Sequence, residues 1–113
     1  MKNKFGFILV NPQLGENIGA CARSMKNFNF KKLNIVSPKF AFPNHKTKVT
    51  SVGAYDIINS AKVFKNINEA INEFDIVISL SARRRDINKK HISFEDFKNI
   101  LKKRSSSKFG FMF

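Results

Sequence analysis

Three residues able to bind and polarise a substrate lie close together near the start of the chain. Asn17, Gly19 and Arg23 fall within two turns of a predicted helix that follows the apolar run FGFILV. An amide, a glycine that permits close backbone approach and a guanidinium fork form a set suited to holding a phosphate or an oxyanion. We expect Arg23 near the same side of the helix as Asn17. The alternative is that Asn17 caps the helix and Arg23 is a solvated cation.

A second basic group follows the apolar run DIVISL. Arg83, Arg84 and Arg85 are consecutive in a chain whose 21 cations are mostly lysine. Lysine and asparagine abundance can follow from an AT-rich coding sequence, whereas a run of arginines is harder to explain in that way. The run therefore favours contact with RNA phosphates over a solvated loop.

Other catalytic patterns do not occur in the sequence. It contains neither G-x-G-x-x-G nor G-x-x-x-x-G-K-[ST], so a dinucleotide or phosphate loop is not predicted. His45 and His91 lack the spacing of metal ligands, and we expect loop histidines and no metal. Cys21 is the only cysteine, which excludes an internal disulfide and favours a reducing, cytoplasmic setting. Its place on an apolar helix face predicts a core residue.

The composition predicts one small folded basic domain. The chain has 113 residues, a net charge of +13 and 42% hydrophobic residues, which excludes a disordered polar chain. No run reaches the roughly 20 apolar residues that span a bilayer. Two basic ends flank a slightly acidic middle: residues 1–50 carry +8, residues 51–75 carry −2 and residues 76–113 carry +7. A nucleic acid is the partner that fits this pattern, ahead of a membrane surface.

These residues must be positioned by alternating strands and helices. Short apolar runs predict strands over residues 5–10, 33–36, 62–64, 75–80 and 109–113. Amphipathic spacing predicts helices over residues 16–28, 47–60 with a break at Gly53, 67–74 after a capping box at Asn66, and a last helix after Ser93, with a loop at 40–48. The alternation predicts an α/β fold, a parallel sheet flanked by helices.

In such sheets ligands bind beyond the carboxyl ends of the strands. Here those ends are residues 11–17, 37–45 and 81–90. The last apolar run, FGFMF, reaches Phe113 without the polar loop that normally follows a buried strand. We therefore expect a truncated chain, with a natural terminal strand as the alternative.

The segment with Asn17, Gly19 and Arg23 resembles the first motif, N-x-G-x-x-x-R, of the SpoU/TrmH (SPOUT) family of RNA 2′-O-ribose methyltransferases. The resemblance is stronger to the TrmJ branch, which methylates cytidine or uridine ribose in the tRNA anticodon loop. That branch also has a G-A-x-D segment, matched by Gly53, Ala54 and Asp56, and a strand ending in S-A-R, matched by Ser81, Ala82 and Arg83.

The resemblance implies an S-adenosylmethionine-dependent enzyme with a trefoil-knotted α/β fold, which acts on tRNA or rRNA as a homodimer in the full-length form. Asn17 and Arg23 match catalytic positions, and Arg23 also an RNA-binding one. Leu80, Ser81 and Ala82 match the cofactor-binding strand end. For Arg23 the chemistry leaves two roles open, general base or clamp on a phosphate and the developing 2′-alkoxide; a guanidinium that keeps its proton favours the clamp.

The family pattern continues beyond the strand matched by FGFMF with G-x-E-x-x-G-L and a third motif that complete the knot and the cofactor pocket. Neither occurs here. We therefore expect residues 1–113 to be the N-terminal part of a single SPOUT methyltransferase domain, with the C-terminal knot segment missing. The alternatives are a non-catalytic basic RNA-binding α/β module and a generic basic interaction domain.

Overall fold

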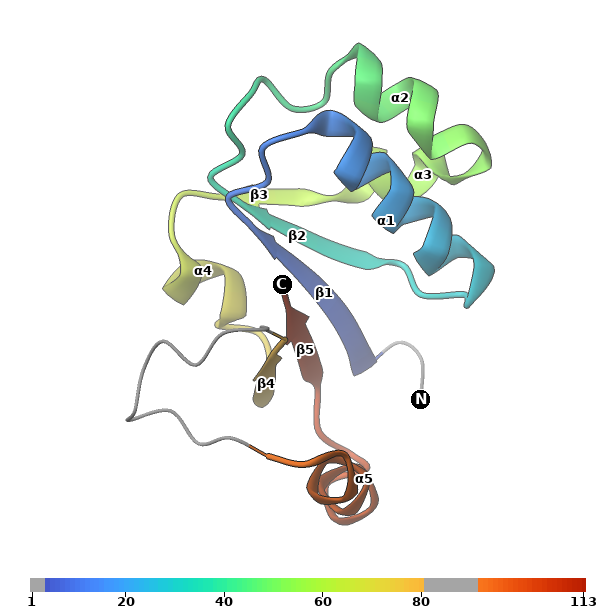
Figure 1. The fold of residues 1–113 in the computed structure, drawn as a ribbon. Helices are drawn as coiled ribbons and strands as arrows, with labels where there is room; N and C mark the ends of the chain where they lie inside the picture. Colours follow the sequence, from blue (N-terminus) through green and yellow to red (C-terminus); the bar gives the residue numbers. More distant parts are fainter. Residues whose placement is uncertain (1–3, 81–91) are drawn as a thin grey trace.

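Five parallel strands form one sheet in the computed structural model, which describes residues 4–80 and 92–113 (Figure 1). Their order across the sheet is β3-β2-β1-β5-β4, and every neighbouring pair is parallel. The strands are β1 (Phe5–Val10), β2 (Lys32–Val36), β3 (Lys62–Phe64), β4 (Ile76–Ser79) and β5 (Phe109–Met112). All five strands predicted from the apolar runs are confirmed, as is the α/β class.

Helices cover both faces of the sheet (Figure 1). They are α1 (Gly15–Asn27), α2 (His45–Ser51), the 3-10 turn η2 (Val52–Ala54), α3 (Tyr55–Ser60), α4 (Ile67–Ile71) and α5 (Phe94–Lys103). On one face α1 and α3 bury Ile18, Ile57 and Ile58 against β2. On the other face Ala70 of α4 packs against Ile8 of β1. The apolar residues are thus buried on both faces, which explains why strands such as FGFILV read as continuous apolar runs.

An aromatic ring occupies the space above two paired glycines. Gly6 of β1 lies opposite Gly110 of β5 in the register, and the ring of Phe74 lies over both. A Cβ at Gly110 would stand 2.9 Å from two carbons of this ring, and a Cβ at Gly6 would stand 2.5 Å from its tip. The two glycines therefore make room for Phe74 to close the core on the α4 face.

The other face of β5 carries a row of phenylalanines. The ring centroid of Phe7 on β1 lies 5.7 Å from that of Phe111 on β5 and 6.3 Å from that of Phe113, which follows β5. Helix α5 contacts this row through Phe97, whose ring meets Phe111 edge-on at 5.9 Å. Phe94, three residues before Phe97 on α5, is 72% exposed, and no residue of α5 is fully buried.

Two helix ends differ from the sequence prediction. Helix α2 begins at His45, inside the predicted loop, because Asn44 and Thr47 form a capping box with reciprocal hydrogen bonds of 2.9 and 3.0 Å. Helix α4 ends at Ile71 and not at Phe74. Asn66 does cap it, accepting from Glu69 N, but the reciprocal bond of a capping box is not formed. The break at Gly53 is confirmed by η2.

Within residues 4–80 and 92–113, no helix has the length and apolar character needed to cross a membrane.

Candidate functional site

The loops that follow β1 and β2 meet at one edge of the sheet, as predicted. Asn11, directly after β1, donates its N–H to Val36 O at 2.8 Å, and Lys39 N donates to Pro12 O at 2.9 Å. Asn11 and Ser37 adopt left-handed backbone conformations with φ of 50° and 46°. These turns send the chain away from the carboxyl ends of both strands and bring α1 and α2 over the same edge.

Glycines allow α2 to approach α1 closely. A Cβ at Gly15 would lie 2.7 Å from Asn44 Oδ1, and a Cβ at Gly19 would lie 2.9 Å from the carbonyl carbon of Thr50. Because Gly19 is buried against backbone, the glycine of the N-x-G segment has a packing function that fixes the position of α1 on α2.

Asn17 lies at this edge and is available for binding. It is the third residue of α1, whose N-cap is Leu14 without a side-chain cap, so the alternative that Asn17 caps the helix is wrong. Asn17 is exposed and lines an apolar pocket of about 440 Å³ together with Leu9, Cys21 and Phe113. Burial raises the pKa of the Cys21 thiol, which lies half-buried at this pocket, in partial agreement with its predicted core position.

Arg23 is exposed on a different side of α1. Six residues span one and two-thirds turns of an α-helix, and Arg23 is not among the residues that line the pocket of Asn17. The prediction that the two share a side of the helix is therefore wrong. Among the residues that the structure describes, Arg23 makes no ion pair or side-chain hydrogen bond, so its guanidinium is presented to solvent.

Of the predicted cofactor and RNA residues after β4, the structure describes Leu80. Leu80 follows β4 directly, donates its N–H to Met112 O at 2.8 Å and has a side chain that is 51% exposed. This confirms that residue 80 lies at a carboxyl strand end beside β5. Five other predicted site residues, Ser81, Ala82, Arg83, Arg84 and Arg85, lie outside the described residues.

The G-A-x-D segment supports α1. Ala54 is 1% exposed in the core, and Asp56 accepts a hydrogen bond of 2.8 Å from Lys26 in the last turn of α1. This hydrogen bond from the Lys26 ammonium, with its charge, lowers the pKa of Asp56. The segment therefore links α3 to α1. His45 is the first residue of α2, so its predicted place in a loop is wrong, and His91 lies outside the described residues. No group of three metal-ligating side chains occurs in the described part of the chain.

Sequence reasoning missed a polar cluster at the opposite, amino edge of the sheet. Asn34 is 1% exposed in β2, and its Nδ2 donates to Ala70 O at 3.0 Å and to Glu73 Oε1 at 2.9 Å. Lys32 Nζ lies 2.6 Å from Glu73 Oε2. The signal in the sequence was an asparagine in the middle of the apolar strand KLNIV.

This cluster predicts an acid-sensitive contribution to stability. Burial works to raise the pKa of Glu73, but the hydrogen bonds from Lys32 and Asn34 and the charges of Lys32 and Lys62 outweigh it, so the pKa is lowered. A carboxyl with a lowered pKa in the folded state stabilises that state above its unfolded pKa near 4.5 and loses this effect as the pH falls through the folded value. We expect Glu73→Gln to lower the free energy of unfolding by no more than about 1 kcal/mol at pH 7. In acid, the unfolding free energy of this variant should fall less with decreasing pH than that of the wild type.

The measurement is the free energy of unfolding in urea from pH 7 to pH 2.5. Glu95→Gln, at a 76% exposed side chain of α5, is the matched control. An equal pH dependence of the two variants would contradict the assigned role of Glu73.

The chain is similar in sequence to proteins of one known family. Residues 4–111 match the model of the SpoU rRNA Methylase family. The chain is 41% identical over 77 residues to a tRNA (cytidine-2′-O-)-methyltransferase TrmJ of Methanocaldococcus jannaschii, an alignment that covers 68% of this chain and 33% of the relative. It is 36% identical over 87 residues to a tRNA (cytidine/uridine/adenosine-2′-O-)-methyltransferase TrmJ of Pseudomonas aeruginosa, covering 77% and 34%.

Among solved structures, TrmJ from Z. mobilis ZM4 superposes with a TM-score of 0.83 at 32% identity, covering 96% of this chain and 48% of that chain. This chain thus spans about a third of the length of the curated relatives that it matches.

Proposed function

Because the chain belongs to the SpoU rRNA methylase family, we propose that it is part of an enzyme that methylates a ribose 2′-oxygen of tRNA. The single observation that supports this most is the family match over residues 4–111, which includes Asn17, Gly19 and Arg23 on a helix at the carboxyl edge of the sheet. The names of the similar proteins, tRNA 2′-O-methyltransferases, favour tRNA as the substrate.

We also propose that residues 1–113 form the N-terminal part of one SPOUT domain. The curated relatives are about three times as long as the matched region, and the pocket beside Asn17 is an open apolar surface next to β5. Such a pocket is suited to being covered by further structure.

The reaction forms a bond between a ribose 2′-oxygen and a methyl group as the methyl–sulfur bond of the donor breaks, and the hydroxyl proton passes to the adjacent RNA phosphate. Arg23 is assigned to hold an adjacent RNA phosphate and the developing alkoxide, because its guanidinium keeps its proton and offers a planar fork of donors. Its exposure and its freedom from partners among the described residues support this assignment. Asn17, at the pocket on the neighbouring side of α1, is assigned to orient the substrate.

S-adenosylmethionine, which supplies an electrophilic methyl group on a sulfonium, is the proposed cofactor. Leu80 fits one requirement of this group, because its half-exposed side chain beside β5 offers an apolar surface at the carboxyl edge. Ser81 and Ala82 are proposed to complete the strand end, and Arg83, Arg84 and Arg85 to contact RNA. A homodimer in the cytoplasm is the proposed working form.

The test is transfer of a tritiated methyl group from S-adenosylmethionine to an unmodified tRNA transcript by the complete polypeptide. We expect incorporation that disappears when the acceptor nucleotide carries 2′-deoxyribose. Binding of tRNA without incorporation would contradict the proposal and support a non-catalytic RNA-binding module.

A further inference from the structure

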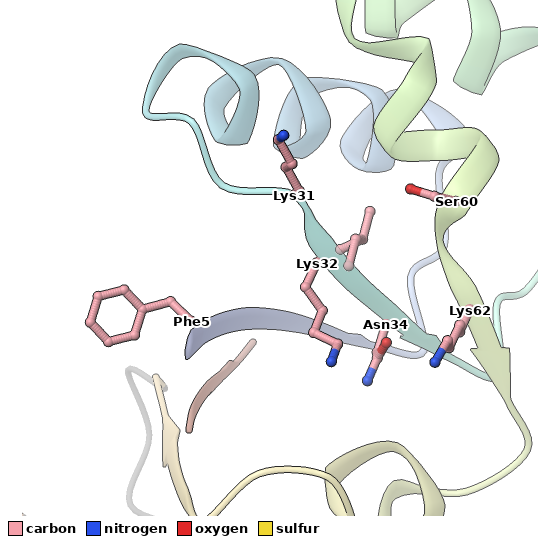
Figure 2. A pocket seen from close by; sticks show the side chains of 7 residues that line it. Phe5, Lys31, Lys32, Asn34, Ser60 and Lys62 are labelled. Carbon is pink, nitrogen blue, oxygen red and sulfur yellow. The ribbon is translucent and has the colours of Figure 1, made fainter. Parts of the chain in front are cut away.

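A pocket of about 300 Å³ opens at the amino ends of β2 and β3, at the far edge of the sheet from Asn17 and Leu80. Lys31, Lys32 and Lys62 line it, together with Asn34 and Ser60 (Figure 2). We name it the lysine pocket. Because β3 is the edge strand, the pocket lies along an open border of the sheet.

The strand register brings three of these side chains to one side. Asn34 of β2 lies opposite Lys62 of β3, and Lys32 precedes Asn34 by two residues on the same face. Figure 2 shows Lys32 and Lys62 ending on the same side of the sheet as the Asn34 amide, while Lys31 and Ser60 lie on the other side of β2. Lysine side chains therefore lie on both faces of the sheet at the amino ends of β2 and β3.

Two of the three lysine charges are uncompensated. Lys32 is paired with Glu73 at 2.6 Å. Lys31 and Lys62 are exposed and form no ion pair with any residue in 4–80 or 92–113. With Glu73 counted, the pocket keeps two net positive charges at neutral pH, which suits an anion.

The buried side chain of Asn34 leaves one acceptor open for an ammonium donor. Both hydrogens of Nδ2 are used, by Ala70 O and Glu73, but the buried Oδ1 has no donor among the described residues. A buried acceptor normally has a partner. The ammonium of Lys62, at the paired position, can give one of its three N–H groups to Oδ1 and direct the other two at a bound anion.

We propose that the lysine pocket binds the phosphate backbone of RNA, with Lys62 donating to non-bridging oxygens from one face of the sheet edge and Lys31 from the other. This inference rests on the proposed function for the identity of the anion. Since the pocket lies at the amino edge, the contact is remote from the proposed reaction site and acts on affinity and orientation of the RNA, not on the chemical step.

The test uses the double variant Lys31→Gln/Lys62→Gln, whose exposed side chains make no ion pair in the described structure. The matched control, Lys102→Gln/Lys103→Gln, removes the same charge from the last turn of α5, which lies away from β2 and β3 (Figure 1). Binding of an unmodified tRNA transcript is measured from 0.05 to 0.3 M salt, over which the Debye length falls from about 14 to about 6 Å.

We expect the log–log salt slope of the first variant to fall by about two and its Kd at 0.1 M salt to rise about tenfold or more. The control keeps the wild-type slope. An unchanged slope in the lysine-pocket variant, or an equal fall in both variants, overturns the proposal.

A second arm distinguishes the source of the phosphate. Inorganic phosphate and tRNA are each titrated while the backbone amide signals of Leu33 and Lys62 are followed by NMR. Shifts caused by tRNA and reduced by excess phosphate support the proposal. Shifts caused by phosphate alone, with none from tRNA, overturn it in favour of a free-phosphate site.

The outcome is separable from that of the methyl-transfer test. In an active enzyme, the lysine-pocket variant is expected to raise KM for tRNA about tenfold with kcat unchanged, whereas a fall in kcat alone overturns the proposal. If the wild type transfers methyl groups but the lysine-pocket variant keeps the wild-type salt slope, only the lysine-pocket proposal is refuted. Methyl transfer that is absent from the wild type, with the salt-slope effect present, refutes only the proposed reaction.

Discussion

Arg23→Lys is expected to lower kcat for methyl transfer to tRNA by about 100-fold or more, a loss similar to the removal of one oxyanion donor in other enzymes. The substitution keeps the positive charge but replaces the planar fork with a single ammonium, which cannot hold a phosphate and the developing alkoxide in one geometry. Arg23 is exposed and has no partner among the described residues, so the fold is expected to be unaffected. The measurement is single-turnover methyl transfer by the complete polypeptide, with circular dichroism as a check of folding.

Arg104→Lys is the matched control, because Arg104 is an exposed arginine at the C-cap of α5. Wild-type rates are expected for this variant. Near-normal turnover of Arg23→Lys would refute the guanidinium role and leave Arg23 as a solvated cation of α1.

Gly19→Ala is expected to destabilise the chain by about 3 kcal/mol, at the upper end of the usual cost of overpacking. The added Cβ would meet Thr50 Oγ1, and it would stand 2.9 Å from the Thr50 carbonyl carbon. Backbone cannot rotate away as a flexible side chain can, so α1 must move relative to α2. For a domain of this size the melting temperature should fall by about 10–20 °C, measured by calorimetry.

Gly53→Ala is the matched control for this effect. No atom lies within 4 Å of a Cβ built at Gly53, and none of the described glycines has positive φ. Alanine there should be neutral or stabilising by up to about 1 kcal/mol. A second variant, Thr50→Gly in the Gly19→Ala background, should recover part of the loss by removing the Thr50 side chain. Equal melting of Gly19→Ala and the wild type would show that the contact between α1 and α2 is not tight.

The strands and the end of α1 could be predicted from the sequence because each is determined by a local pattern. FGFILV and FGFMF are continuous apolar runs, and Asn29 ends the α1 region with φ of 63°, as expected of a residue that tolerates the left-handed conformation. The parallel sheet followed from the alternation of these runs with helices.

The end of α4 could not be predicted in this way, because a tertiary contact determines it. In a continued helix Ala70 O would accept from Phe74 N, but Asn34 donates to Ala70 O and Phe74 N donates to Ile71 O instead. Asn34 is far from α4 in the sequence, so the local sequence of α4 does not predict this hydrogen bond to Ala70 O. The same limit applies to Phe74, whose position over Gly6 and Gly110 depends on the pairing of β1 with β5.

The candidate site was predictable in its location and not in its detail. Asn17 and Leu80 lie at the carboxyl edge, because that edge collects the loops of a parallel sheet. The separation of Asn17 from Arg23 around α1 follows from helix geometry, which motif spacing alone does not describe. The lysine pocket was missed because its residues come together only through the register of β2 and β3.

The strand order has a consequence for how the chain folds during synthesis. β1 pairs with β2 across one helix, but its other edge pairs with β5, so that Phe5 meets Phe109. Contacts between residues so far apart in the sequence form late in folding, because bringing the two segments together costs loop-closure entropy. On the ribosome, the edge of β1 beside the buried Ile8 therefore stays unpaired until β5 has been made, and nascent chains are expected to aggregate at this open edge. Insertion of β5 between β1 and β4 is the step that joins the strands into one five-stranded sheet.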